Sequence, residues 1–120
     1  MKDLDWANLT FGYRKTDYNV RCYYRDGKWG EIEVCSDENI NMHMAATCLH
    51  YGQEAFEGLK AYRCPDGKVR IFRVKDNAAR LQSTCDGIVM PKVSTEMFEE
   101  MVKKVVRLNQ EWIPTYESGA

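Results

Sequence analysis

The sequence predicts an α+β fold: two β-hairpins in an antiparallel or mixed sheet, followed by two α-helices. Two tight-turn signals, each flanked by segments with strand character, divide the chain before residue 73, and two stretches of helical periodicity follow. A chain of 120 residues fits one domain or part of one. Its 44% hydrophobic and 29% charged residues are typical of a globular protein.

The first hairpin is predicted over residues 18–35. Residues 18–25 alternate in polarity and are rich in Tyr, Val and Cys, as strands are. Asp26-Gly27 is a strong two-residue turn signal, because both residue types tolerate positive φ. Residues 28–35 then return as the second strand, and residues 36–46 form a polar connection.

The second hairpin is predicted from a strand candidate over residues 55–64. In the turn that follows, Pro65 presets φ near about −65° and Gly67 supplies the left-handed position. Residues 69–73 complete this hairpin as an alternating strand.

Two helices are then expected, the first beginning at Lys75 or Asp76 and stopped by Pro91. Ser94 is a good N-cap for the second helix, which Pro114 ends. Apolar residues at helical spacing define the inner face of the first helix: Ala78, Leu81, Cys85 and Ile88. A longer apolar stripe marks the second: Phe98, Met101, Val102, Val105, Leu108 and Trp112.

Charge and hydropathy exclude several classes of function. The net charge is −1 and no basic block occurs, so nucleic acid is not an expected partner. No run of 18 apolar residues occurs, and residues 1–6 lack the apolar core of a signal peptide, so a cytoplasmic protein without a membrane partner is expected. The five cysteines include no C-x-x-C pair, which favours reduced thiols, and His43 and His50 lack zinc-ligand spacing.

The most informative segment is LHYGQEAFEGLKAY, residues 49–62, which packs aromatic residues, carboxylates and two glycines into a turn that feeds a strand. It closely resembles a segment of the branched-chain amino-acid aminotransferases, pyridoxal 5'-phosphate enzymes of fold type IV. Other resembling segments follow the family's order: TFG (10–12), VRIFR (69–73), NAARL (77–81), EWIP (111–114) and SGA (118–120). Two departures are the variable Gln53-Glu54 and the lack of a proline at 74–76.

Arg80 is the foremost candidate site residue. A guanidinium is a permanently charged planar fork that binds phosphate oxygens, and the first turns of a helix favour anions. From the residues alone, a solvated arginine that pairs with Asp76 or Asp86 is the more ordinary interpretation. The resemblance implies instead that Arg80, three residues after Asn77, binds the cofactor phosphate.

Four further residues are candidates for substrate binding. From the residues alone Phe11, Tyr51 and Phe56 are expected in the core, and Tyr51 could also line a cavity. The resemblance implies that these aromatics line a pocket for an aliphatic side chain. Gly58 allows either a bulge or the close approach of a strand or ligand.

The two charged residues near Gly58 are expected to have a structural role only. Glu57 and Lys60 are read as an ion pair at the strand edge, with no catalytic role.

No catalytic residue is predicted in the chain. Transamination needs a lysine that forms an imine with the cofactor, and none of the nine lysines lies in a segment that resembles the family's site. In the family that lysine belongs to a larger second domain. Residues 1–120 are therefore expected to be an N-terminal small domain, incomplete at its C-terminus, that cannot transaminate alone and exposes an unpaired sheet edge.

The resemblance implies a homodimeric enzyme that moves the amino group of leucine, isoleucine or valine to 2-oxoglutarate, giving a branched 2-oxo acid and glutamate. D-amino-acid aminotransferase and aminodeoxychorismate lyase share the fold type and remain alternatives. A non-catalytic interaction module with the same small-domain fold is a further alternative from another class of function.

Overall fold

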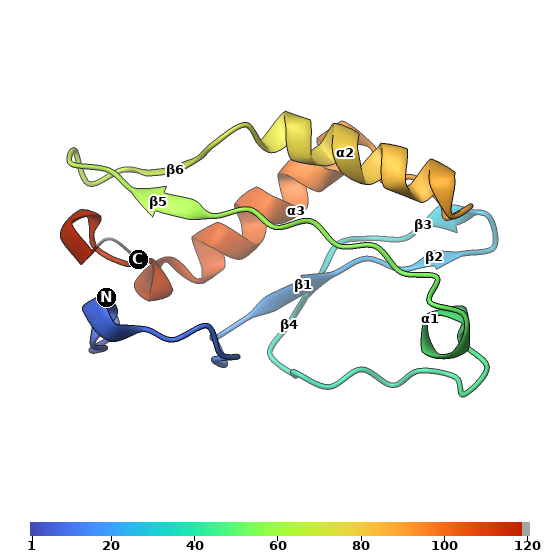
Figure 1. Ribbon diagram of the computed structural model, residues 1–120, viewed down its shortest axis with the longest axis horizontal. Coiled ribbons are helices and arrows are strands. Elements are labelled where there is room, and N and C mark those ends of the chain that lie inside the picture. Colours follow the sequence, from blue (N-terminus) through green and yellow to red (C-terminus); the bar gives the residue numbers. More distant parts are fainter. Residues whose placement is uncertain (119–120) are drawn as a thin grey trace.

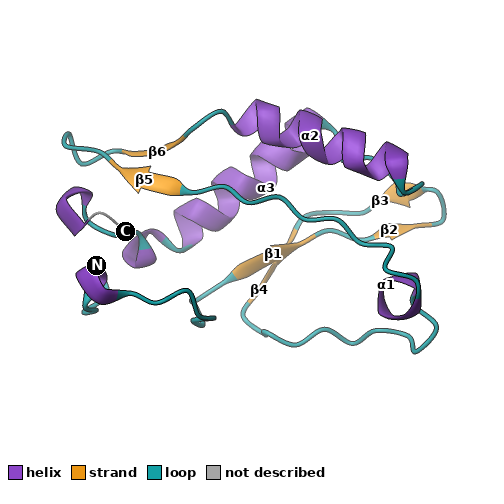
Figure 2. Ribbon diagram, viewed as in Figure 1, coloured by secondary structure: helices purple, strands orange, loops and turns teal. Residues whose placement is uncertain are grey.

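The computed structural model describes residues 1–118 and has α+β architecture, as the sequence predicts (Figures 1 and 2). The helices α2 (Val74–Gly87) and α3 (Thr95–Leu108) lie beside one another, with the strands arranged around them. The strands form three two-stranded antiparallel sheets: β1 (Asn19–Arg21) with β4 (Glu33–Cys35), β2 (Tyr24–Arg25) with β3 (Lys28–Trp29), and β5 (Ala61–Arg63) with β6 (Val69–Ile71).

The first hairpin turns at Asp26-Gly27, as predicted. The φ angles of +53° and +78° at these residues are the left-handed pair that a type I′ turn requires. Each predicted strand is interrupted, however, so that β1 and β2 are separated at residues 22–23 and β3 and β4 at 30–32. The Gly30 amide donates to the Tyr23 carbonyl over 2.8 Å at the interruption, which keeps the two arms together.

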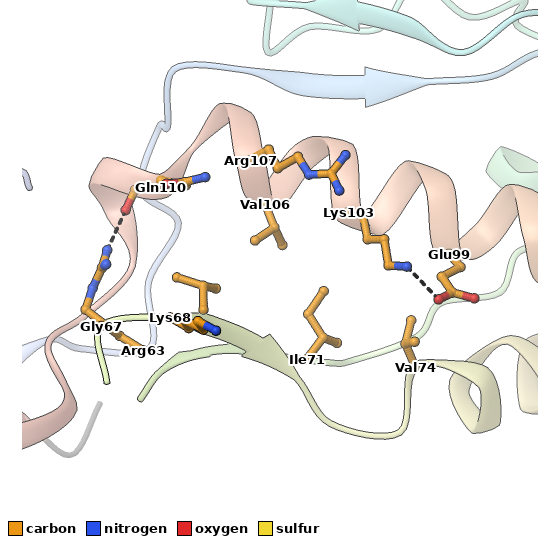
Figure 3. Close-up of a pocket in the computed structure, with 11 residues that line it drawn as sticks. Arg63, Gly67, Lys68, Ile71, Val74, Glu99, Lys103, Val106, Arg107 and Gln110 are labelled. Atoms are coloured by element: carbon orange, nitrogen blue, oxygen red, sulfur yellow. Dashed lines mark hydrogen bonds and ion pairs between the residues drawn. The ribbon is translucent and has the colours of Figure 1, made fainter. Parts of the chain in front are cut away.

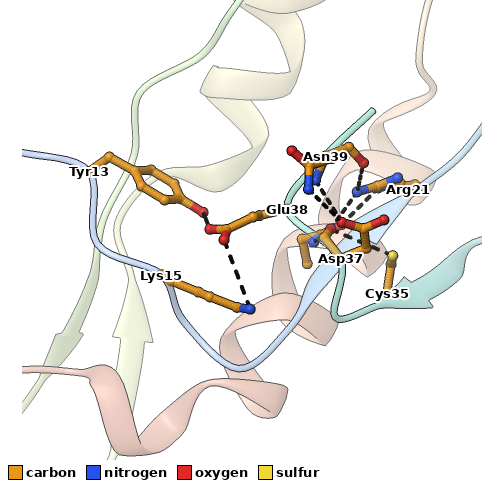
Figure 4. Close-up of polar contacts among 8 residues, drawn as sticks. Tyr13, Lys15, Arg21, Cys35, Asp37, Glu38 and Asn39 are labelled. Atoms are coloured by element: carbon orange, nitrogen blue, oxygen red, sulfur yellow. Dashed lines mark hydrogen bonds and ion pairs between the residues drawn. The ribbon is translucent and has the colours of Figure 1, made fainter. Parts of the chain in front are cut away.

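Polar contacts secure the chain around the end of β4 (Figure 4). The Arg21 guanidinium donates to the carbonyls of Asp37 and Asn39, at 2.5 and 3.0 Å. The Asp37 carboxylate accepts from the Asn39 amide over 2.9 Å, and this bond lowers the pKa of Asp37. The Tyr13 hydroxyl donates to Glu38 over 2.9 Å, which raises the pKa of the tyrosine and ties the N-terminal segment to this loop.

The second hairpin is shorter than predicted. After the short helix α1 (Thr47–His50) the chain is extended, but only Ala61–Arg63 of the predicted strand over 55–64 is paired, because β6 reaches no further. Burial nevertheless alternates residue by residue from 53 to 63, with the odd-numbered residues turned inward. The turn is as predicted, since Gly67 has a φ of +79° and its amide donates to the Cys64 carbonyl over 2.9 Å.

Helix α2 (Val74–Gly87) begins one or two residues before the predicted start at Lys75 or Asp76. It ends at Gly87, so the expectation that Pro91 stops it after Met90 is wrong. The chain leaves the helix where glycine weakens it, and Val89 takes the left-handed conformation with a φ of +58°.

Helix α3 (Thr95–Leu108) has the predicted N-cap, because the Ser94 hydroxyl accepts from the Met97 amide over 3.1 Å. It ends at Leu108 and not at Pro114, since Asn109 caps it and the chain continues as the short 3-10 helix η2 (Gln110–Trp112). The last member of the predicted apolar stripe therefore lies beyond the helix.

Little of the described chain is deeply buried. Its buried apolar residues lie on α2, α3 and the segment after η2: Ala78, Cys85, Phe98 and Ile113. The radius of gyration is 16.1 Å, against about 14 Å for a compact domain of this length. The accessible surface is 9181 Å², against about 6,700 Å² for a folded monomer of this mass. The fold is thus elongated, with extents of 44 × 28 × 24 Å.

The five cysteine thiols are free, with Cys85 buried and the others half-buried. Within residues 1–118, no helix has both the length and the apolar character needed to cross a membrane. The Lys2 amide donates to the Glu111 carbonyl over 2.7 Å, which holds the start of the chain beside the segment that follows α3 (Figure 1). The resembling segment SGA (118–120) includes residues 119 and 120, which lie outside the described residues.

Candidate functional site

The candidate site is built where the extended segment 52–60 crosses helix α2. Asn77 and Arg80 are three residues apart on the helix, which places both side chains on the same face. The Arg80 guanidinium donates from Nε and Nη2 to the two carboxylate oxygens of Glu57, over 2.7 and 2.6 Å. Asn77 Nδ2 donates to the same carboxylate over 2.9 Å and to the Gly58 carbonyl over 3.2 Å. These bonds join the segment to the helix.

The Arg80–Glu57 ion pair is strongly asymmetric in burial. The Glu57 side chain is 6% exposed, whereas the Arg80 side chain is 66% exposed. Hydrogen bonds from Arg80, and then from Asn77, lower the pKa of Glu57 although burial opposes them. The charged acid therefore lies inside, and the guanidinium faces solvent.

Two ordinary interpretations of these ions are wrong. Arg80 does not pair with Asp76 or Asp86, because Asp76 pairs with Arg73 and Asp86 with Lys92. Glu57 likewise pairs with Arg80 and not with Lys60, since the inward turn of Glu57 carries its carboxylate toward α2 while Lys60 is exposed.

The aromatic candidates do not lie in the core. Relative exposures of Phe11, Tyr51 and Phe56 are 112%, 83% and 89%, so the expectation of core positions is wrong. Tyr51 directly follows α1, whereas Phe56 and Gly58 share the outward face of the extended segment. Within the described chain, these three side chains are therefore exposed to solvent.

One hollow does bring predicted residues together. Phe11, Gly58 and Asn77 contribute to a surface hollow of about 510 Å³, together with Leu59, Lys60, Tyr62 and Phe72. A Cβ added at Gly58 would meet open space, so the described neighbours do not themselves require glycine there. The hollow adjoins the Glu57–Arg80 pair through Asn77, which both share.

A second cavity, of about 590 Å³, separates α3 from the β5–β6 hairpin (Figure 3). Valine and isoleucine side chains of β6, α2 and α3 form part of its wall, and four cations lie at its margin: Arg63, Lys68, Lys103 and Arg107. Lys103 is paired with Glu99 over 2.8 Å, and Arg63 donates to the Gln110 carbonyl over 3.0 Å. No residue predicted for the site lies here.

Comparison with known proteins adds a relationship by sequence. No protein-family model matches the chain. Over all 120 residues the chain is 52% identical to the branched-chain-amino-acid aminotransferase of Haemophilus influenzae. The chain is a homologue of the branched-chain-amino-acid aminotransferases. It is also 44% identical over its whole length to that enzyme of Helicobacter pylori, and 38% identical to the chloroplastic branched-chain-amino-acid aminotransferase 5 of Arabidopsis thaliana.

The homology extends over only part of each aminotransferase. The chain spans about a third of the length of these relatives: 35%, 35% and 29% respectively.

The pairing of Glu57 with Arg80 was not predicted from the sequence. Its signal was the alternation of the segment, which turns residue 57 inward, where a carboxylate requires a cation or donors. Arg80 lies 23 positions away, and only the packing of the segment on α2 brings the two together.

Proposed function

We propose that this chain is the N-terminal small domain of a pyridoxal 5'-phosphate-dependent branched-chain amino-acid aminotransferase. The enzyme would transfer the amino group of leucine, isoleucine or valine to 2-oxoglutarate, giving a branched 2-oxo acid and glutamate. The observation that carries the proposal is the 52% identity over the whole chain to an enzyme of that name. A homodimer in the cytoplasm is part of the proposal. The relatives' names favour a branched-chain aminotransferase over a D-amino-acid aminotransferase or an aminodeoxychorismate lyase.

The residues of the site suit a phosphate. Arg80 presents an exposed, permanently charged guanidinium midway along α2, and its anchoring on Glu57 leaves donors for a second partner. Arg80 would therefore hold the cofactor phosphate. The cofactor, when bound, supplies an electron sink for the negative charge that develops at the amino acid's Cα.

The substrate side chain would be bound by apolar surface. Phe11, Tyr51 and Phe56 each offer an exposed aromatic ring, and Gly58 leaves open space above the backbone. Rings without a counter-charge suit an aliphatic side chain, and one methylene more or less changes binding by about 1–3 kcal/mol. Discrimination among leucine, isoleucine and valine would consequently be modest.

The chain would contribute binding and not the proton-transferring lysine. None of its nine lysines lies in a segment that resembles the family's imine-forming site, so residues 1–120 alone are expected to be inactive. Steady turnover by residues 1–120 alone would contradict this part of the proposal.

The activity is tested with the protein that carries this chain, mixed with pyridoxal 5'-phosphate, leucine and 2-oxoglutarate, by following glutamate. We expect glutamate formation, and an Arg80→Ala variant that needs much more cofactor to reach the same rate. Arg70→Ala is the matched control, because it also removes a two-bond ion pair, with Asp66 at the hairpin turn. A folded, cofactor-bound protein that forms no glutamate would refute the proposed reaction.

A further inference from the structure

We propose that Glu57 is a positioning residue, which holds one edge of the Arg80 guanidinium so that the opposite edge faces the phosphate of the cofactor. The inference rests on the proposed function, in which Arg80 binds that phosphate. It assigns to a nearly buried carboxylate a role in anion binding that its charge alone would not suggest.

The geometry of the pair carries the inference. A guanidinium has five N–H donors in a fixed plane. Glu57 takes one from Nε and one from Nη2, at 2.7 and 2.6 Å. The second hydrogen of Nη2 and one hydrogen of Nη1 then form a free edge at the end of the guanidinium, while the other Nη1 hydrogen points toward the Cδ side. Within residues 1–118, Nη1 makes no hydrogen bond. Because the Arg80 side chain is 66% exposed, this edge can meet an anion from outside.

The carboxylate is itself fixed in place. Asn77 Nδ2 donates to Glu57 Oε2 over 2.9 Å and to the Gly58 carbonyl over 3.2 Å. Burial of Glu57 to 6% exposure leaves its carboxylate little access to water, so the helix face and the extended segment determine its orientation. Arg80 therefore loses its freedom to rotate when the chain folds, and less remains to be lost when an anion binds.

Charge and positioning predict opposite effects of removing the acid. Glu57 partly neutralises Arg80, so simple attraction predicts that a Glu57→Gln variant binds a phosphate dianion more tightly. Positioning predicts weaker binding, because the glutamine amide has only one accepting oxygen and turns N–H groups toward one of the two Arg80 donors. The sign of the change in affinity thus separates the two accounts.

The test uses the protein that carries this chain, titrated with pyridoxal 5'-phosphate and, separately, with pyridoxal, which lacks the phosphate. Loss of one charge-assisted hydrogen bond corresponds to about tenfold or more in affinity. We expect Glu57→Gln to weaken binding of the phosphorylated form by about that factor and to change pyridoxal binding by less than about twofold. Asp66→Asn, which removes the acid of the Arg70 pair, is the matched control and should change neither.

A second variant decides the matter if Glu57→Gln does not fold. Arg80→Lys keeps the charge on an exposed side chain, but an ammonium has no second planar edge. Positioning predicts that this variant loses nearly as much affinity for pyridoxal 5'-phosphate as Arg80→Ala, whereas charge alone predicts affinity near that of the wild type.

The outcomes separate the inference from the function on which it rests. Unchanged or tighter binding of pyridoxal 5'-phosphate by folded Glu57→Gln overturns the positioning role, and so does an equal loss for both ligands. An Arg80→Ala variant with unaltered affinity for both ligands overturns the phosphate role of Arg80 itself. A loss in Arg80→Ala without any loss in Glu57→Gln overturns only the inference.

Discussion

Replacing Asn109 by alanine should strongly destabilise the chain, because this amide joins the N-terminal segment to the end of α3. Asn109 is 9% exposed and makes four hydrogen bonds through its side chain. Its oxygen accepts from the amides of Asp17 and Tyr18, at 3.1 and 3.0 Å. Its nitrogen donates to the carbonyls of Tyr18 and Val105, at 2.9 and 2.8 Å. Alanine leaves all four backbone groups without this partner.

The magnitude follows from these bonds. Each is worth about 0.5–1.5 kcal/mol net, and water can replace part of the loss in a half-buried site, so we expect a decrease of about 2–4 kcal/mol in the free energy of unfolding. Urea denaturation followed by circular dichroism should show the midpoint falling by about 1 M or more, given ordinary m-values.

The control for this prediction is Asn8→Ala, which removes one exposed hydrogen bond to Asp5 and should change stability by no more than about 0.5 kcal/mol. A change for Asn109→Ala as small as that of the control would refute the reasoning, because it would mean that the four bonds contribute nothing net.

Three further predictions concern a helix cap, a pH dependence and association. Ser94→Ala should lower the free energy of unfolding, measured by urea denaturation, by about 1 kcal/mol, since the Met97 amide loses its acceptor. An unchanged urea midpoint would mean that the Ser94 cap does not stabilise α3. The lowered pKa of Glu57 means that its pairing stabilises the fold above the ordinary glutamate pKa of about 4.3, and that this stability is lost as pH falls through the lowered value. The urea midpoint of the wild type should therefore fall more steeply below that pH than that of Glu57→Gln, and parallel profiles would count against the pair. Light scattering of residues 1–120 should show mass rising with concentration, since every strand of the described sheets has one unpaired side; a monomer at high concentration would exclude this.

Local signals predicted much of the fold. The Asp26-Gly27 turn and the cap at Ser94 depend on neighbours a few residues away, so the sequence alone locates them. The end of α3 could not be predicted in this way, because it depends on a contact with a distant segment. Asn109 shows this, since it ends α3 while bound to residues more than 90 positions earlier.

The site was predicted unevenly for the same reason. The helix that carries Asn77 and Arg80 was predicted, and in the structure both side chains donate to Glu57. The acid that pairs with Arg80 could not be chosen correctly, because Asp76 and Asp86 are nearer in sequence and Glu57 approaches only through tertiary packing. Aromatic residue type likewise predicted burial for Phe56, while the alternation along its segment turns that ring outward.

The large accessible surface of the folded chain has a thermal consequence. The native state exposes about 2,500 Å² more than a compact monomer of its mass, so unfolding has less surface left to hydrate. The heat-capacity increment should then fall below the roughly 1.6 kcal/mol/K typical of this length, which flattens the stability curve and broadens the melting transition. A partner that binds this surface in the native state, but not in the unfolded state, would restore the curvature of the stability curve. It would also raise the melting temperature by mass action.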